Sequence, residues 1–236
     1  MKPRIYLIPN LLGSEASVAS SIPSYNIEII SKLRLFAVEH LKDARRFLVK
    51  IGLKEIIDQS DFFELNNQSN QRAAYDIIQE VAKGNDIGII SDAGCPGVAD
   101  PGAGLVHLAH QKGFYVIPLV GPSSILMAVM ASGFSGQSFA FNGYLDRDKN
   151  RRPSVIKHLE GKANKESQTQ VFMETPYRNE ALFQDLLKHL NPNTFLAIAC
   201  DISLPTEYIQ TKKVMDWKKT NKPSLQKRPA IFSISV

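Results

Sequence analysis

The chain has 236 residues, of which 44% are hydrophobic and 22% are charged, with a formal net charge of +5 at pH 7. These proportions are ordinary for a globular protein and argue against intrinsic disorder, while the small positive excess suits a polyanionic partner without requiring one. Two cysteines and five scattered histidines offer no CxxC motif and no metal spacing, so neither a disulfide scaffold nor a metal site is expected.

The first half of the chain alternates short apolar runs with segments of helical periodicity. Strands are predicted at residues 4–8, 33–38, 86–91 and 114–118, and helices at 23–32, 41–50, 73–81 and 102–112. This alternation is typical of a parallel sheet covered by helices.

The second half predicts helices at residues 123–132 and around 182–190, and strands at 139–142, 170–173, 194–199, 207–212 and 230–236. Residues 212–228 are predicted to be the least structured and most basic part. We expect two domains, residues 1–119 and 120–236.

No membrane segment and no signal peptide is expected. The first apolar run ends at Pro9, which is too early for a signal peptide. Residues 113–145 carry no charge, but Pro118, Gly121 and Pro122 divide their apolar part into pieces too short to span a bilayer. The sequence therefore predicts a cytoplasmic protein.

Residues 91–102, SDAGCPGVADPG, lie between a predicted buried strand and a predicted helix. In an open parallel sheet, ligands bind beyond the carboxyl ends of the strands. Gly94, Gly97 and Gly102 allow positive φ and a close approach of the backbone to a ligand, and two prolines stiffen the loop. A ligand-binding loop is predicted, with a mere tight connection as the alternative.

Three further segments follow predicted strands. Residues 120–124, VGPSS, either only cap a helix or also contact a ligand. Residues 173–178, METPYR, begin a helix, and Glu174 and Arg178 in them could simply pair with each other. Residues 146–152, DRDKNRR, form either a solvated loop or a phosphate-binding patch. The GxGxxG, GxxxxGK[ST] and GxSxG motifs are absent.

Residues 91–102 resemble the SDAGTPxxSDPG motif of the ribosomal RNA small-subunit methyltransferase I family, a branch of the tetrapyrrole methylases. The resemblance continues in chain order, since residues 6–13 resemble its LYLIPTPLGN start, 121–124 its GPSA, 141–145 its FxGFL and 172–178 its FYESPHR.

The sequence also departs from this pattern. Leu11 replaces the family's proline, residues 39–42 read EHLK for EDTR, and residues 199–204 read ACDISL for ARELTK. The family's usual C-terminal extension is not part of the sequence.

The resemblance implies an α/β fold of the two-domain tetrapyrrole-methylase type. It has a parallel-sheet N-terminal domain, a mixed-sheet C-terminal domain and a cofactor cleft between them. The implied cofactor is S-adenosylmethionine, and the implied assembly is a homodimer. The positions that match the family's cofactor contacts are Leu11, Ala93, Gly94, Cys95, Val98, Ser123, Ser124, Met173, Glu174, Asp201, Pro229 and Ala230.

The family methylates the 2′-hydroxyl of a ribose in small-subunit ribosomal RNA, and such a hydroxyl reacts poorly unless a group accepts its proton. Asp92 and Glu174 are the predicted candidates for this base. The residues expected to contact the RNA are Arg147, Lys149, Arg151, Arg152 and Arg178. Two alternatives stay open: methylation of a tetrapyrrole or other small molecule, and a non-catalytic module that only binds the cofactor.

Overall fold

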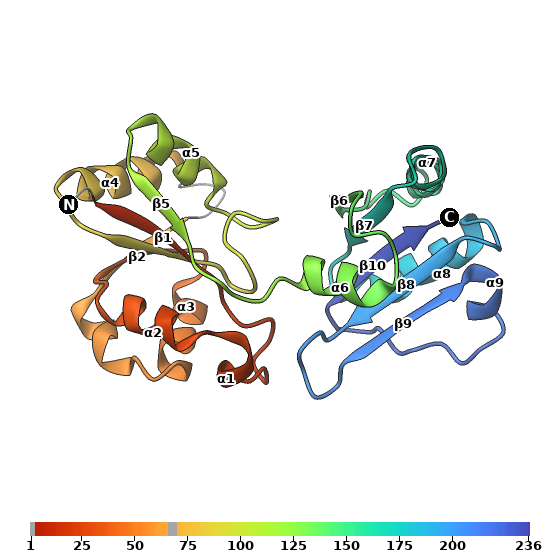
Figure 1. Cartoon of the computed structure of the whole chain (residues 1–236), viewed down its shortest axis with the longest axis horizontal. Helices are drawn as coiled ribbons and strands as arrows, with labels where there is room; N and C mark the ends of the chain where they lie inside the picture. The colour runs from red at the N-terminus through yellow and green to blue at the C-terminus, as the bar shows by residue number, and fades with distance from the viewer. Residues whose placement is uncertain (1–2, 66–69) are drawn as a thin grey trace. The chain divides into compact units, whose positions relative to one another are not determined.

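The computed structural model describes residues 3–65 and 70–236, and the chain divides into two compact units, Met1–Ser123 and Ser124–Val236. Each unit is built on its own five-stranded sheet (Figure 1). The predicted boundary between residues 119 and 120 falls in the segment between β5 (Tyr115–Pro118) and α6 (Ser124–Ser132). Among the described residues, no helix combines the length and apolar character needed to cross a membrane.

The first unit contains a wholly parallel sheet with the strand order β3-β2-β4-β1-β5. Besides β5, its strands are β1 (Arg4–Ile8), β2 (Leu35–Val38), β3 (Asp61–Glu64) and β4 (Ile87–Ile90). The central strand, β4, is buried along its entire length, as the apolar run in the sequence predicts.

Helices cover both faces of this first sheet. Figure 1 shows α4 and α5 over one face and α2 and α3 against the other. Ile5, Ile87 and Ile89 of the sheet share a core cluster with Ile77 of α4 and Leu105 of α5. The helical segments of the unit are α1 (Val18–Ser21), α2 (Ser24–Ser31), α3 (Leu41–Lys50), the 3-10 helix η1 (Lys54–Gln59), α4 (Asn70–Ala82) and α5 (Ala103–Gln111).

The second unit contains a mixed sheet with the strand order β6-β7-β10-β8-β9. β6 and β7 are parallel, and the other neighbouring pairs are antiparallel. Its strands are β6 (Phe139–Tyr144), β7 (Thr169–Met173), β8 (Phe195–Cys200), β9 (Tyr208–Lys213) and β10 (Ala230–Ser235). Its helices are α6, α7 (Arg152–Glu166), α8 (Asn179–His189) and α9 (Val214–Trp217).

The predicted α/β class, with a parallel first sheet and a mixed second sheet, is confirmed. Each predicted strand and helix is present, with ends that differ by a few residues. The prediction missed β3, η1, α1, α7 and α9. β3 is a four-residue edge strand with only two apolar positions, and four residues are too few to show a period.

The prediction that residues 212–228 are the least structured part is wrong for their first residues. Lys213 extends β9 by one residue beyond the strand predicted at 207–212, and α9 follows it directly. Trp217 of α9 is fully buried, where its indole N–H donates to the Leu196 carbonyl at 2.9 Å and its ring meets that of Phe183 edge-on at 5.5 Å. This aromatic anchor orders a segment whose charges alone suggested a loop.

Candidate functional site

Three loops meet at the carboxyl edge of the first sheet. Because all strands of this sheet are parallel, the residues after β1, β4 and β5 emerge at the same edge. Asn10, after β1, forms two backbone hydrogen bonds with Gly94 at 2.8 and 3.1 Å. Its side-chain amide donates to the carbonyls of Ser91 and Asp92 at 2.9 and 3.1 Å. Asn10 therefore ties the first loop to the 91–102 loop.

The third loop, residues 119–123, is held against the first two. The Cys95 thiol lies 3.4 Å from the Pro122 carbonyl, and the Asn26 amide donates to the Val120 carbonyl at 2.7 Å. A Cβ on Gly121 would lie 2.3 Å from the Cβ of Pro9, so only glycine permits this approach.

The backbone of the 91–102 loop has the geometry that its glycines predict. Gly94, Gly97 and Gly102 have φ values of +67°, +76° and +120°, which confirms the predicted positive φ. Ala93 and Val98 are exposed on this loop. Such a loop presents backbone and small apolar side chains to a ligand, which is what a nucleoside cofactor requires.

A groove of about 360 Å³ opens beside these loops. It is lined by Leu11, Asp92 and Ala93, together with Arg46 and Lys50 of α3. The structure therefore brings predicted cofactor residues and a predicted base, Asp92, into one surface of the first unit.

The Asp92 carboxylate is paired with a histidine that the prediction did not single out as a site residue. His40 Nδ1 lies 2.5 Å from Asp92 Oδ2, and the two side chains are 64% and 31% exposed. The hydrogen bond and charge of Asp92 raise the pKa of His40 above its ordinary value. Two signals in the sequence pointed to His40: it lies two residues beyond a predicted strand, and it belongs to the 39–42 segment that departs from the family's EDTR pattern.

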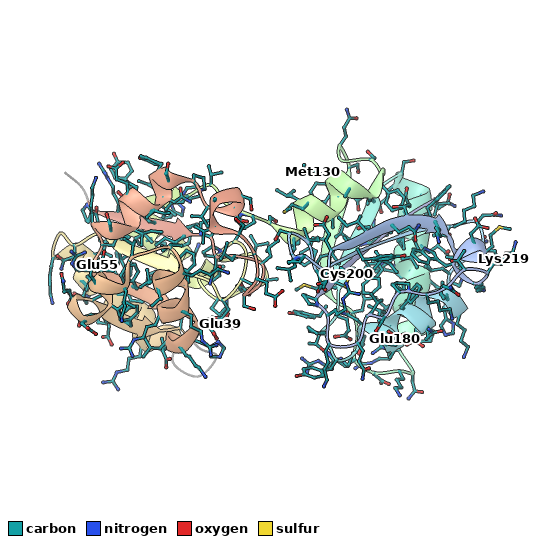
Figure 2. The ribbon with its side chains drawn as sticks, turned by 90° about the horizontal axis from the view of Figure 1, so that it is seen from below. Glu39, Glu55, Met130, Glu180, Cys200 and Lys219 are labelled. Carbon is teal, nitrogen blue, oxygen red and sulfur yellow. The ribbon has the colours of Figure 1, made fainter. Side chains whose placement is uncertain are left out.

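Two further carboxyl groups lie near this pair. Burial, and then the charge of Asp92, raise the pKa of Glu39, which is labelled in Figure 2. Burial, followed by the charges of Glu39 and Asp92, raises the pKa of Asp100 to about 6. The carboxyl edge of the first sheet is thus an acidic site with one imidazole.

Glu39, His40 and Asp92 also bring metal-ligand atoms within 4.8 Å of one another. His40 Nδ1 and Asp92 Oδ2 are hydrogen-bonded to each other, so a cation that used these two atoms would have to displace that bond. We therefore assign no metal to this cluster, and the absence of a metal stays a prediction.

Glu174, the second predicted base, lies after β7 of the second unit and its side chain is fully buried. Its Oε1 accepts hydrogen bonds from Arg178 Nη2 at 2.5 Å and from the Thr175 amide at 2.8 Å. Arg152 Nη2 lies 3.8 Å from its Oε2. The alternative that Glu174 and Arg178 pair with each other is confirmed. A carboxylate enclosed by two arginines is poorly placed to take a proton from a substrate.

The expectation that Arg152 contacts RNA is contradicted by its burial. Its side chain is only 2% exposed, with Nη1 donating to Asp185 at 2.8 Å and Nε to the Asp146 carbonyl at 3.0 Å. The guanidinium fixes the start of α7 instead of facing solvent. The other cations of this segment are exposed, namely Arg147, Lys149 and Arg151.

The remaining predicted cofactor residues of the second unit gather at one edge of its sheet. Ala230 pairs with Cys200 across β10 and β8, and the Asp201 amide donates to the Pro229 carbonyl at 3.0 Å. Ile231 pairs with Met173 at the end of β7. The Asp201 carboxylate accepts hydrogen bonds from Thr206 and Arg228, both at 2.7 Å, so it braces this edge. Ser124 begins α6.

The prediction also missed a basic face on α3. Lys42, Arg45, Arg46 and Lys50 are exposed along ten residues, with Asp43 as the one acid of the helix. Arg45 lies over the Phe62 ring at 5.6 Å. The density of cations directly after a predicted strand could have identified this face.

Residues 29–216 match the family model described as Tetrapyrrole (Corrin/Porphyrin) Methylases. A protein of Buchnera aphidicola subsp. Schizaphis graminum, named ribosomal RNA small subunit methyltransferase I, is 28% identical over 98% of this chain and 77% of its own length. A Thermotoga maritima protein of the same name is 32% identical over 71% of this chain and 72% of its own length.

Solved structures share the fold at lower identity. The methyltransferase CobJ has a TM-score of 0.63 at 15% identity and covers 98% of this chain and 92% of its own. Uroporphyrin-III C-methyltransferase of Thermus thermophilus has a TM-score of 0.55 at 18% identity and covers 100% of this chain and 93% of its own. At these identities the likeness concerns the fold alone.

Proposed function

The chain belongs to the tetrapyrrole methylase family, and we propose that it is an S-adenosylmethionine-dependent methyltransferase acting on a ribose 2′-hydroxyl of small-subunit ribosomal RNA. The observation that carries the proposal is the convergence of three loops at the carboxyl edge of the first sheet. The names of the relatives support RNA as the substrate.

The first unit offers a cradle for the cofactor. Gly94 and Gly121 stand where a larger residue would be strained or would strike Pro9, so glycine at these positions lets the three loops pack closely together. The residues that would hold the cofactor in this unit are Leu11, Ala93, Gly94, Cys95, Val98 and Ser123. The resemblance adds Ser124, Met173, Glu174, Asp201, Pro229 and Ala230 from the second unit.

When bound, S-adenosylmethionine supplies a methyl group that its positive sulfur activates for displacement. The chain's own task is then to orient the acceptor hydroxyl, to exclude water and to receive one proton. Of the two predicted bases, Asp92 is partly exposed at the converging loops, whereas Glu174 is enclosed by arginines.

Two exposed basic surfaces could hold the phosphates of the RNA. The first consists of Arg147, Lys149 and Arg151, with Arg151 also paired to Asp146 and Asp148 at 3.2 and 3.3 Å. The second is the basic face of α3, of which Arg46 and Lys50 line the groove beside Asp92.

Filter binding of a small-subunit ribosomal RNA fragment across a salt series tests these surfaces. Each lost single-strand phosphate contact should reduce the log–log slope by about 0.7, so changing Arg147, Lys149 and Arg151 to Ala should reduce it by about 2. A control that changes the exposed Lys54, Lys83 and Lys112 to Ala removes equal charge and should leave the slope unchanged.

Equal slopes for the first variant and the wild type would count against the 147–151 surface, and the α3 face would then be tested with Lys42, Arg45 and Lys50 changed to Ala. Absence of RNA binding at low salt would overturn the RNA proposal and favour a small-molecule substrate. In cells, deletion of the gene should remove one ribose methylation from small-subunit ribosomal RNA.

We also propose a homodimer, which the resemblance implies. Met130 on α6 exposes 81% of its surface, as expected of an apolar contact residue (Figure 2). Sedimentation should give twice 26.3 kDa, and a monomer at micromolar concentration would contradict the proposal. Because the proposed substrate is ribosomal RNA, the cytoplasm stays the expected compartment.

A further inference from the structure

The pairing of His40 with Asp92 follows from the register of the first sheet. β2 and β4 are parallel neighbours in which Val38 pairs with Ile90. His40 and Asp92 each stand two residues further along the chain, so the two strands deliver them to the same point beyond the sheet. The pair is thus built by the centre of the fold, and it lies next to Ala93 and Gly94 of the 91–102 loop.

The hydrogen bond fixes which nitrogen of His40 can act as an acceptor. A carboxylate can only accept, so the 2.5 Å contact places the proton on Nδ1 and leaves Nε2 of the neutral ring with its lone pair. The His40 side chain is 64% exposed, so the ring is accessible to a substrate. This is the geometry of a histidine base oriented by a carboxylate.

The charges around the pair are mainly negative. Asp92, then Glu39 and Asp43, raise the pKa of His40, while burial lowers it. On the neighbouring elements, Glu64 at the end of β3 accepts from the Leu41 amide at 3.1 Å. The nearby cations belong to the basic face of α3, and Asp100 completes the acidic set.

We propose that His40 is the catalytic base of the methyl transfer and that Asp92 is its positioning residue. This assignment rests on the proposed function, because it needs a hydroxyl substrate. His40 Nε2 takes the hydroxyl proton while the oxygen forms a bond to the methyl carbon of S-adenosylmethionine. The carbon–sulfur bond breaks, its electron pair stays on sulfur, and the imidazolium that forms is stabilised by Asp92.

The first test needs no cofactor and no activity. The titration of the histidine ring signals is followed by NMR in the wild type, with the His40 signal assigned by its loss in His40→Gln. The pKa of His40 should lie above 6.5, the ordinary value for histidine, and it should fall in Asp92→Asn because the charge and acceptor that favour the imidazolium are removed. A His40 pKa that is equal in both proteins would overturn the pairing.

The second test is the pH dependence of methyl transfer to small ribosomal subunits. His40→Ala should lower kcat about 100-fold with little change in KM, because general-base catalysis contributes about 100-fold or more. In Asp92→Asn the acid limb of the kcat profile should move to lower pH, in parallel with the NMR titration. His110→Gln, which removes an exposed histidine from α5, is the matched control and should behave as the wild type.

The outcomes separate the two proposals. Wild-type kcat and an unchanged acid limb in His40→Ala, with RNA still methylated, would overturn the role of His40 and leave the proposed function intact. A wild-type protein that transfers no methyl group to RNA would overturn the proposed function and the role of His40 with it. Thermal unfolding of each variant shows whether lost activity reflects lost structure.

Discussion

Asp92 and Glu174 occupy equivalent places in the two units of this protein. Each follows a strand and precedes a helix, yet Asp92 is partly exposed beside an exposed histidine, whereas Glu174 is buried between two arginines. The sequence offers Glu174 a local partner, Arg178, which lies four residues further on. It does not reveal the distant partners, which are His40 for Asp92 and Arg152 for Glu174, and these distant partners complete the difference between the two carboxylates.

The two environments also differ in what they contribute to stability. Exposed ion pairs are worth at most about 1 kcal/mol, whereas removing one partner of a buried network leaves a charge without compensation and costs about 3–5 kcal/mol. The fold therefore depends little on the Asp92–His40 pair, which can take part in catalysis, whereas the Glu174 network stabilises the second unit. Three substitutions, one in the buried network and two in the 91–102 loop that carries Asp92, test how the two regions differ.

Arg152→Ala should give the largest effect. It removes the partner of Asp185 and one neighbour of Glu174, and it should lower the free energy of unfolding of the second unit by about 3 kcal/mol. Trp217 is the one tryptophan of the chain and is buried in this unit, so its fluorescence in a urea titration reports the change.

The matched control is Arg151→Ala, which removes a neighbouring exposed arginine and should shift the transition little. Asp92→Asn should also leave the Trp217 transition unchanged. A loss below about 1 kcal/mol in Arg152→Ala would contradict the structural role of the buried network.

Gly94→Val should weaken cofactor binding about 100-fold. A β-branched residue is strained at φ +67°, so the loop would have to change its backbone conformation, although an added Cβ would meet the Leu12 side chain only at an ordinary contact distance of 3.4 Å. Calorimetry with S-adenosylhomocysteine measures the change. Gly104→Ala in α5, where an added Cβ meets nothing within 4 Å, is the control. Undiminished binding to Gly94→Val would remove the 91–102 loop from the cofactor site.

Asp100→Asn should give the smallest effect, and its sign depends on pH. Burial and the charges of Glu39 and Asp92 raise the folded-state pKa of Asp100 from 3.8 to about 6. The folded state thus binds the proton more tightly than the unfolded state, so stability is lost as pH rises from about 4 to about 6. In Asp100→Asn the side chain carries no charge at any pH, so the protein does not lose this stability.

The expected gain for Asp100→Asn is about 1 kcal/mol at pH 7, since solvent screening reduces the effect of a partly exposed group, and it should vanish at pH 4. Circular dichroism reports the unfolding of both units, and its comparison with Trp217 fluorescence, which reports the second unit alone, isolates the transition of the first unit. An equal gain at both pH values would show that charge is not its cause.

The fold was accessible to sequence reasoning because apolar runs and helical periods report local structure directly. The run at residues 87–90 predicts a buried strand, and the glycines after it predict the positive φ values that the loop adopts. The same reasoning placed Arg152 in a surface patch, because neither its burial nor its contact with Asp185 leaves any trace in neighbouring residues.

The His40–Asp92 pair was also beyond sequence reasoning, for a related reason. The two residues are 52 positions apart, and their contact depends on the pairing of β2 with β4. Periodicity predicts that each strand exists but not which strand is its neighbour. Long-range register is therefore the information that the sequence pattern lacked.

We propose above all that this chain methylates a ribose of small-subunit ribosomal RNA. The most direct measurement incubates the purified protein with S-adenosylmethionine labelled in the methyl group and with small ribosomal subunits from cells that lack the gene. We expect one labelled methyl group per RNA, recovered in a dinucleotide that resists alkali, since a methylated 2′-oxygen cannot attack the adjacent phosphate. Label in the mononucleotides that alkali releases, or RNA without label, would contradict methylation of a ribose 2′-hydroxyl.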